Sequence, residues 1–202
     1  MSSVPTKLLT PAEYLARERA AEFKSEFYKG EMFAMAGANR RHNLICSAFV
    51  AAAVPLLRPH GCNVFGSDMR VRVADTNFYT YPDVSIACGK IEYEDDELDV
   101  LLNPCVIVEV LSKSTERRDR GWKFQKYWNI PTLVDYILIS QDKPLIEQFI
   151  RKQDGLWSFQ HVEGDSAVLH LIAVRCEIPL RDIFQDVDFG PEDVPRPAEP
   201  PA

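Results

Sequence analysis

The sequence lacks the apolar segments that direct a chain into or across a membrane. Its N-terminus has no basic stretch followed by an apolar run and small residues, which is the order typical of a secretory signal. Its longest apolar run, residues 44–57, is interrupted by Ser47 and Pro55 and is shorter than the roughly 20 residues that a transmembrane helix needs. We therefore expect a cytoplasmic protein with no membrane partner.

Paired cysteines and clustered histidines are also missing. The chain has five cysteines, an odd number, and no two of them form a C-x-x-C pair. Its four histidines are scattered, and their spacing relative to the cysteines predicts no Cys/His zinc site. We expect reduced, mostly buried thiols rather than a disulfide framework.

An excess of positive charge is missing as well. The net charge is −7, which on its own argues weakly against a nucleic-acid partner, because phosphate binding needs cations. The charges are unevenly spread, however. Residues 92–99, EYEDDELD, hold six acids, whereas residues 113–126, KSTERRDRGWKFQK, hold six Lys and Arg against two acids. An acidic total therefore coexists with a basic patch.

Three segments of the sequence are predicted to be helices from residues typical of helix starts and ends. Thr10, Pro11 and Glu13 suit the N-cap, first and third positions of a helix that runs to about residue 23. Asn39 can cap a second, largely apolar helix over residues 40–58. A third helix is predicted over residues 116–129, before Pro131.

Strands alternate with these helices in the order of a mixed α/β (α+β) domain. A hairpin is predicted over residues 26–36, turning at Lys29-Gly30. Further strands are predicted over 62–73, 80–87, 104–111, 133–139 and 145–151, and another hairpin over 156–174. This order indicates a central sheet flanked by helices. We predict one domain over residues 1–188 and a Pro-rich, disordered tail over residues 189–202.

Glu109 interrupts the most apolar of these strands, within VIVEVLSKST. Side chains alternate along a strand, so Glu109 shares a face with Ile107 and Leu111. A buried carboxylate there is unfavourable unless it is paired, protonated or bound to a cation. A buried ion pair with Lys or Arg is one explanation, and a metal site is the other.

Asp83 repeats this arrangement at the start of another apolar strand, directly after Pro82. It fits an ordinary turn, but acids on two neighbouring strands can also converge and share a divalent cation. The basic helix after Glu109 adds Asp119 and Lys123, four residues apart on one face, with Tyr127 one turn further. Taken alone, Asp119 and Lys123 are more simply explained as a solvated ion pair on a helix surface. Near a metal, Lys123 could orient an attacking water and offset charge on a phosphate.

The motifs YPDVSIACG, PCVIVEVLSKST and DRGWKFQKY, in this order, resemble the core of the Uma2 (DUF820) family of the PD-(D/E)xK nuclease superfamily. The upstream KGEMFAMAGANRRH is similar to the hairpin and downstream His of that family. The resemblance implies a restriction-endonuclease-like core in which Asp83, Glu109 and the Val110 carbonyl bind Mg²⁺ or Mn²⁺. It further implies that Lys123 replaces the usual lysine, since that strand position is Leu111 here.

The resemblance also gives Glu31 and His42 supporting positions, beside Asp119 and Tyr127. It makes a metal-dependent DNA endonuclease the leading hypothesis. The alternative is a nuclease fold without catalysis that binds nucleic acid or protein, and a homodimer fits either. The basic residues that could contact the DNA backbone are Arg40, Arg41, Lys113, Arg117, Arg118 and Arg120.

Overall fold

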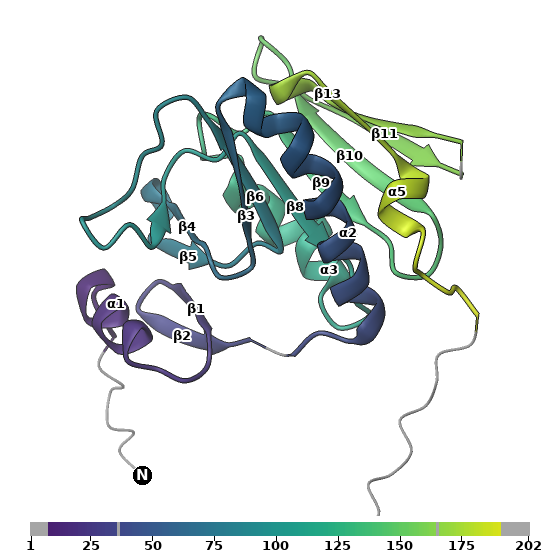
Figure 1. The fold of residues 1–202 in the computed structure, drawn as a ribbon. Coiled ribbons are helices and arrows are strands. Elements are labelled where there is room, and N and C mark those ends of the chain that lie inside the picture. Colours follow the sequence, from purple (N-terminus) through teal and green to yellow (C-terminus); the bar gives the residue numbers. More distant parts are fainter. Residues whose placement is uncertain (1–7, 36, 165, 191–202) are drawn as a thin grey trace, which may run out of the picture.

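The computed structural model describes residues 8–35, 37–164 and 166–190 (Figure 1). A six-stranded mixed sheet forms its centre, in the order β11-β10-β9-β8-β6-β3, with only β8 and β9 parallel. These strands are β3 (Cys62–Gly66), β6 (Val84–Cys88), β8 (Val106–Val110), β9 (Asp135–Ile139), β10 (Leu145–Arg151) and β11 (Trp157–Glu163). The predicted mixed α/β class with a central sheet is confirmed.

A second mixed sheet has the order β2-β1-β5-β4-β7. Its strands are β1 (Ser25–Tyr28), β2 (Glu31–Ala34), β4 (Arg70–Val73), β5 (Phe78–Thr80) and β7 (Val100–Leu101). The β1–β2 hairpin turns at Lys29 and Gly30, both of which have positive φ, as predicted. In Figure 1 this sheet and α1 (Pro11–Arg19) lie beside the larger sheet, on the side opposite β10 and β11.

Two helical segments cover the two faces of the central sheet. The helix α2 (Arg40–Leu57) begins at Asn39, whose side chain accepts a hydrogen bond from the His42 amide, as predicted. On the other face lie α3 (Glu116–Arg118), a π-helical turn η3 (Asp119–Lys123) and α4 (Phe124–Tyr127), which follow one another without a break. Strand β8 is buried along its whole length because it is covered on both faces.

The side chains of β8 divide between two hydrophobic cores. Val106, Val108 and Val110 pack in the α2-side core with Phe49 and other residues of α2. Ile107 and Leu111 pack in the α4-side core with Phe124 and Tyr127 of α4. The alternation predicted from the sequence therefore assigns Glu109 to the α4 side.

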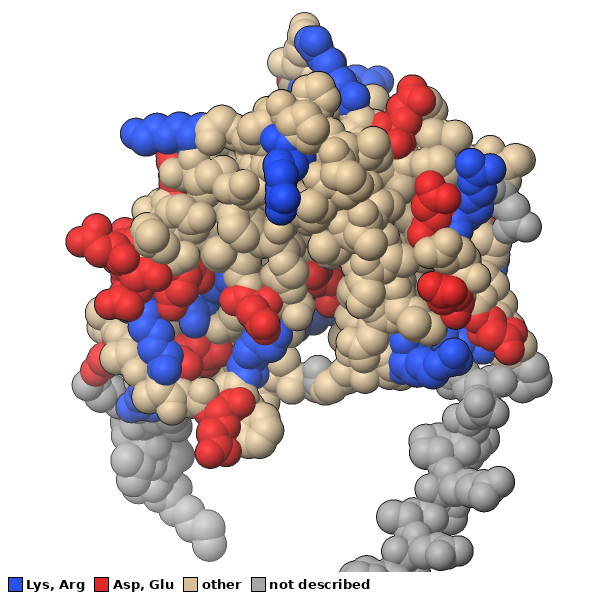
Figure 2. Space-filling view, in the orientation of Figure 1, with Lys and Arg blue, Asp and Glu red and all other residues tan. Residues whose placement is uncertain are grey.

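Among the described residues, Arg40–His60 is the one helical segment long and apolar enough to cross a membrane by length and composition alone. Here α2 serves as a core helix, because Ile45, Phe49 and Leu57 are fully buried against the sheet. Figure 2 shows that charged side chains instead gather over α1, β1 and β2, whereas the surface over α2 is largely uncharged.

Two strand predictions are wrong. The segment 62–73 is not one strand, because the chain turns at Ser67 and Asp68 and passes from β3 into β4 of the other sheet. The segment 156–174 is not a hairpin: β11 pairs with β10, and β12 (Val168–Leu171) pairs with β13 (Cys176–Pro179). The reason is packing at long range, since Leu169, Leu171 and Ile178 join the α2-side core beside α5 (Leu180–Phe184).

The predicted tail over 189–202 lies outside the described residues from residue 191 onward. Its first two residues are described. Phe189 packs against the α2-side core and contacts the ring of Phe184, and the Gly190 carbonyl accepts a hydrogen bond from Arg41.

Candidate active site

Asp83 and Glu109 lie at the same end of the central sheet, Asp83 in the loop before β6 and Glu109 on the neighbouring strand β8. Strands β6 and β8 are antiparallel with Val84 opposite Val108, so Asp83, directly before β6, comes level with Glu109. The backbone amide of Val110 donates a 2.7 Å hydrogen bond to Asp83 Oδ2, which ties the loop carboxylate to β8. Both acids line one large cleft together with Val110.

Within the described part of the chain, each of the two acids keeps one oxygen that accepts no hydrogen bond. Glu109 Oε1 accepts from Tyr127 Oη at 2.8 Å and from Lys123 Nζ at 2.7 Å. Asp83 Oδ2 contacts the Val110 amide and His42. Glu109 Oε2 and Asp83 Oδ1 accept no hydrogen bond from the residues described. Two oxygen atoms of the kind that divalent cations prefer are therefore left at the cleft.

Lys123 reaches the site from η3, the π-helical turn on the face of the central sheet opposite α2. Its ammonium lies 2.7 Å from Glu109, 3.7 Å from Glu26 and 3.8 Å from Asp119. Lys123 and Asp119 are both only 4% exposed, although they stand on a helix of basic composition. π-Helical turns are rare and are frequently found at functional sites. Here the turn directs two charged residues inward.

Burial and neighbouring charges shift the proton affinities of these groups. Burial, together with the charges of Asp119 and Asp83, raises the pKa of Glu109 to about 8, although Lys123 opposes the shift. Burial alone would lower the pKa of Lys123, but Glu109, Glu26 and Asp119 raise it above its ordinary value. Lys123 therefore stays charged, and a cation at Glu109 has to compete with a proton.

Glu26 belongs to the site and was not predicted. It lies on β1, 2% exposed, and pairs with Arg118 as well as with Lys123. Burial opposes its ionisation, but Lys123, Thr80 and Arg118 together hold the pKa of Glu26 below its ordinary value. The available signal was an acid at the first position of the predicted hairpin over residues 26–36, next to the apolar Phe27. The predicted Glu31 instead lies exposed at the start of β2, across from Tyr28, and does not line the cleft.

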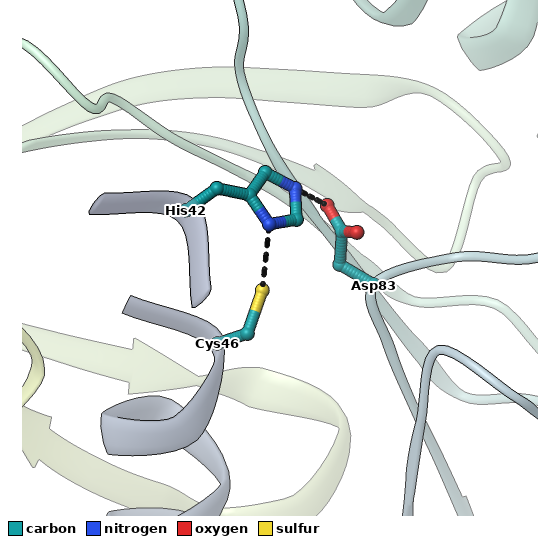
Figure 3. A group of neighbouring side chains, drawn as sticks. All are labelled: His42, Cys46 and Asp83. Carbon is teal, nitrogen blue, oxygen red and sulfur yellow. Dashed lines mark hydrogen bonds and ion pairs between the residues drawn. The ribbon is translucent and has the colours of Figure 1, made fainter. Parts of the chain in front are cut away.

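His42 lies at the cleft with its ring between two other side chains (Figure 3). Its Nε2 is 3.1 Å from Asp83 Oδ2, and its Nδ1 is 3.5 Å from Cys46 Sγ. Burial, with the nearby charges of Asp83 and Glu109, raises the pKa of the Cys46 thiol. His42 was among the residues predicted from the family resemblance, and Cys46 was not.

The cleft has a volume of about 1560 Å³ and is not strongly basic. Its acids are Glu22, Glu26, Asp83, Glu109, Glu116, Asp119 and Asp142, and its bases are Lys24, Lys113, Arg118, Arg120, Lys123 and Lys143. Among the described residues, every one of these bases except Lys113 pairs with a carboxylate.

The residues predicted to contact DNA are divided by the structure. Lys113, Arg118 and Arg120 line the cleft, and Arg40, Arg41 and Arg117 do not. Arg118 pairs with Glu26 and lies over the ring of Trp122, and Arg120 pairs with Glu116 and Glu147. Lys113 is exposed and has no ion-pair partner in the described part of the chain.

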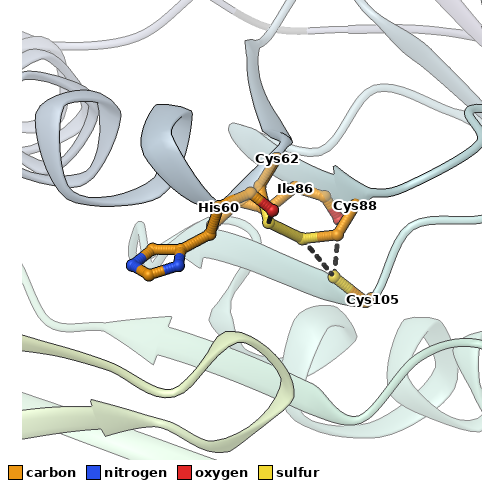
Figure 4. Close-up of a disulfide and its surroundings, with 5 residues drawn as sticks. All are labelled: His60, Cys62, Ile86, Cys88 and Cys105. Carbon is orange, nitrogen blue, oxygen red and sulfur yellow. Dashed lines mark hydrogen bonds between the residues drawn. A yellow bond between two sulfur atoms is a disulfide. The ribbon is translucent and has the colours of Figure 1, made fainter.

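The other cysteines correct the expectation of uniformly free thiols. Cys62 and Cys88 lie directly opposite each other on β3 and β6 and form a disulfide (Figure 4). Cys105 Sγ lies 3.8 Å from Cys88 Sγ, and Cys46, Cys105 and Cys176 are free. The expectation was wrong for the pair because strand register, which no cysteine spacing reveals, brings residues 26 positions apart into contact.

Comparison with known proteins agrees with this architecture. A family model named Uma2 and described as "Putative restriction endonuclease" matches residues 11–181, most of the chain. The chain belongs to the Uma2 family. The family resemblance predicted from the three motifs is therefore confirmed, and with it the membership in a group described as nuclease-like.

Relatives of this Uma2 protein include two from Synechocystis sp. that carry no described activity. The protein slr1290 is 35% identical over 93% of this chain and 97% of its own length. The protein sll1609 is 37% identical over 80% of this chain and 92% of its own length. A crystal structure from Anabaena variabilis, described as a "putative nuclease belonging to DUF820", matches with a TM-score of 0.71. It covers 88% of this chain and 98% of that chain at 17% identity, and so confirms the predicted fold alone.

Proposed function

We propose that this Uma2 protein is a metal-dependent endonuclease that hydrolyses phosphodiester bonds of DNA. One observation carries the proposal: the carboxylates of Asp83 and Glu109 and the ammonium of Lys123 meet at one cleft. They come from three separate elements, and each is costly to bury alone. An arrangement of this kind is more easily explained by a shared chemical task than by fold stability.

The donor set at the two carboxylates fits Mg²⁺ or Mn²⁺. Asp83 and Glu109 would hold the cation through their oxygens, with the Val110 carbonyl as a further ligand, since these ions favour carboxylate and carbonyl oxygen. When bound, such a cation polarises a phosphate and lowers the pKa of a coordinated water.

Side chains of the protein would stabilise charge, orient the attacking water and keep the reacting groups aligned. Lys123 would stabilise the negative charge that grows on the phosphate and orient the attacking water. Tyr127, which donates to Glu109 Oε1, and Asp119, which lies 3.8 Å from Lys123, would keep these two groups aligned. Arg118 would be held at the cleft wall by Glu26.

A nicking assay on supercoiled plasmid tests the proposal. Wild type with Mg²⁺ or Mn²⁺ should cleave, and Glu109→Gln should be slower by about 10²–10³-fold, the typical effect of losing one group that stabilises charge in a transition state. Glu163→Gln is the matched control, because Glu163 pairs with Lys143 on the surface and should leave cleavage unchanged. Equal rates in wild type and Glu109→Gln would show that the cleavage comes from another source.

A nuclease fold that binds without cleaving is the second candidate. The acidic and basic side chains that line the cleft in similar numbers favour it, because a duplex is gripped by cations that are free to neutralise phosphate. Titration calorimetry separates the two. Mg²⁺ binding that disappears in Asp83→Asn supports the enzyme, whereas a wild type that binds no Mg²⁺, with or without DNA, supports the module.

The predicted homodimer is also a proposal. The central sheet ends at β11 and β3, and an edge strand exposes backbone groups that can pair with a second copy. Light scattering should give a mass of twice the 23.0 kDa chain. A mass of one chain at micromolar concentration would contradict it.

A further inference from the structure

Helix α2 presents a nitrogen and a sulfur ligand to the carboxylate of Asp83. His42 and Cys46 are four residues apart and so lie on one helical face. This is the spacing at which pairs of side chains on a helix chelate metal ions, as in H-E-x-x-H motifs. One donor atom from each of His42, Cys46 and Asp83 lies within 4.8 Å of the others, at the partly buried wall of the cleft (Figure 3).

We propose that His42, Cys46 and Asp83 form a second cation site, which takes a transition metal of the zinc class. Imidazole and thiolate are ligands for Zn²⁺ and Co²⁺, whereas Mg²⁺ selects oxygen ligands. The site is therefore distinct in chemistry from the oxygen site at Asp83 and Glu109. It does not rest on cleavage of DNA.

The three groups lie near the separations of zinc ligands but not yet at them, since one donor atom from each lies within 4.8 Å of the others. Zinc bonds of 2.0–2.1 Å to nitrogen and 2.3 Å to sulfur place two tetrahedral ligands about 3.3–3.6 Å apart. In the present arrangement His42 uses both ring nitrogens, with Nε2 3.1 Å from Asp83 Oδ2 and Nδ1 3.5 Å from Cys46 Sγ, whereas an imidazole gives one nitrogen to one ion. Because the ring stands between the other two groups, closing all three around one ion requires it to rotate. All three residues are only partly buried at the cleft, which allows that rotation.

Asp83 would then join the two sites through its two oxygens. Oδ2 faces His42, and Oδ1 accepts no hydrogen bond from the described residues. A carboxylate shared in this way is the bridge of two-metal centres, whose ions lie about 3.5–4 Å apart. The competing explanation is a plain hydrogen-bonded row from Cys46 through His42 to Asp83, which needs no metal.

Cobalt spectroscopy of the full-length protein distinguishes the proposed cation site from a hydrogen-bonded row without a metal. Titration with Co²⁺ should produce a thiolate-to-cobalt charge-transfer band that saturates at one ion per chain. Zn²⁺ should abolish the band at equal concentration, and a large excess of Mg²⁺ should leave it. Cys46→Ser should lose the band, and His42→Gln should weaken Co²⁺ affinity at least about tenfold. Cys176→Ser, which removes another free thiol, is the matched control and should keep the band.

Three outcomes would overturn the proposal: no charge-transfer band in wild type, a band that persists in Cys46→Ser, or a band that Mg²⁺ removes as readily as Zn²⁺. The wild-type spectrum remains decisive even where a variant fails to fold. Glu109→Gln should keep the cobalt band while losing cleavage. Failure of the nuclease proposal, seen as no cleavage by any form, is thus separate from failure of this site, seen in the spectrum.

Discussion

Replacing Lys123 by Met should show how much the site depends on the buried ammonium of this residue. Lys123 lies within 4 Å of three carboxylates, at 2.7 Å from Glu109, 3.7 Å from Glu26 and 3.8 Å from Asp119. Met has a similar length and apolar stem, so the substitution removes the charge and little volume. What remains is a set of buried acids without their counter-ion.

The expected loss is large compared with that of an ordinary ion pair. Removing one partner of a buried pair typically costs about 3–5 kcal/mol, because the other charge is left uncompensated. In a chain of this length that corresponds to a fall of about 6–20 °C in Tm. Lys143→Met provides the matched control. Its pair with Glu163 is 54% exposed on both sides, and such pairs contribute less than about 1 kcal/mol.

The loss should grow as the pH rises. The pKa of Glu109 is raised to about 8 by burial, so at pH 5 this carboxyl is protonated, and its electrostatic interaction with Lys123 is weak. The pKa of Lys123 is raised, so in wild type its stabilising charge is present at every pH below its unfolded value of about 10.4. Without Lys123 the pKa values of Glu109, Glu26 and Asp119 all rise, because this cation lowers each of them. The folded variant therefore binds more protons than folded wild type, and its stability relative to wild type falls as the pH rises. The destabilisation should therefore be smallest at pH 5 and largest at pH 8.5.

Urea unfolding followed by circular dichroism at pH 5, 7 and 8.5 measures the effect. Adding Mg²⁺ should stabilise Lys123→Met more than wild type, because a divalent cation can take the place of the missing ammonium. Saturation at 100 times Kd would contribute about 2.7 kcal/mol. The reasoning is refuted if Lys123→Met is no less stable than Lys143→Met at pH 8.5, or if its loss is independent of pH.

Three further perturbations test other parts of the structure. Cys62→Ser should lower the free energy of unfolding by about 3.5 kcal/mol, which is the loop entropy expected for a 26-residue separation. Reduction of wild type should cause the same loss in urea unfolding. A wild type whose stability does not change with reductant would contradict the disulfide. Thr10→Ala should cost about 1 kcal/mol by the same measurement, because it removes the capping box of α1, whereas Thr10→Ser should be neutral. Mg²⁺ affinity, measured by calorimetry, should rise about tenfold per pH unit up to about pH 8, where Glu109 loses its proton, and a flat profile would refute a role for that carboxyl.

Local patterns in the sequence predicted local structure well. The capping box at Thr10 and the Asn39 cap depend on residues three positions apart, and both are present. The two-residue period of β8 assigned Glu109 to the same side as Ile107 and Leu111, because strand geometry fixes alternation whatever lies around it. Family motifs then supplied the connection between distant segments that periodicity alone does not contain.

The missed features all depend on contacts between distant segments. The sequence does not distinguish Glu26 from Glu31, because both lie in one hairpin and only the pairing of β1 with β5 determines which of them faces Lys123. The Cys62–Cys88 bridge depends on the register of β3 against β6. The pairing of β12 with β13 depends on which apolar residues α5 and α2 can cover. No spacing along the chain encodes these choices.

The position of the lysine has a structural consequence. Leu111, the position at which the family resemblance led us to look for a lysine, is buried in the α4-side core, and its carbonyl accepts a hydrogen bond from Gln141. With the lysine on β8, the strand alone would fix its distance from Glu109. With Lys123 on η3, that distance depends on how α4 packs through Phe124 and Tyr127. Core packing and site geometry are therefore coupled here, because the residues that hold the helix against the sheet also hold the ammonium against the carboxylates.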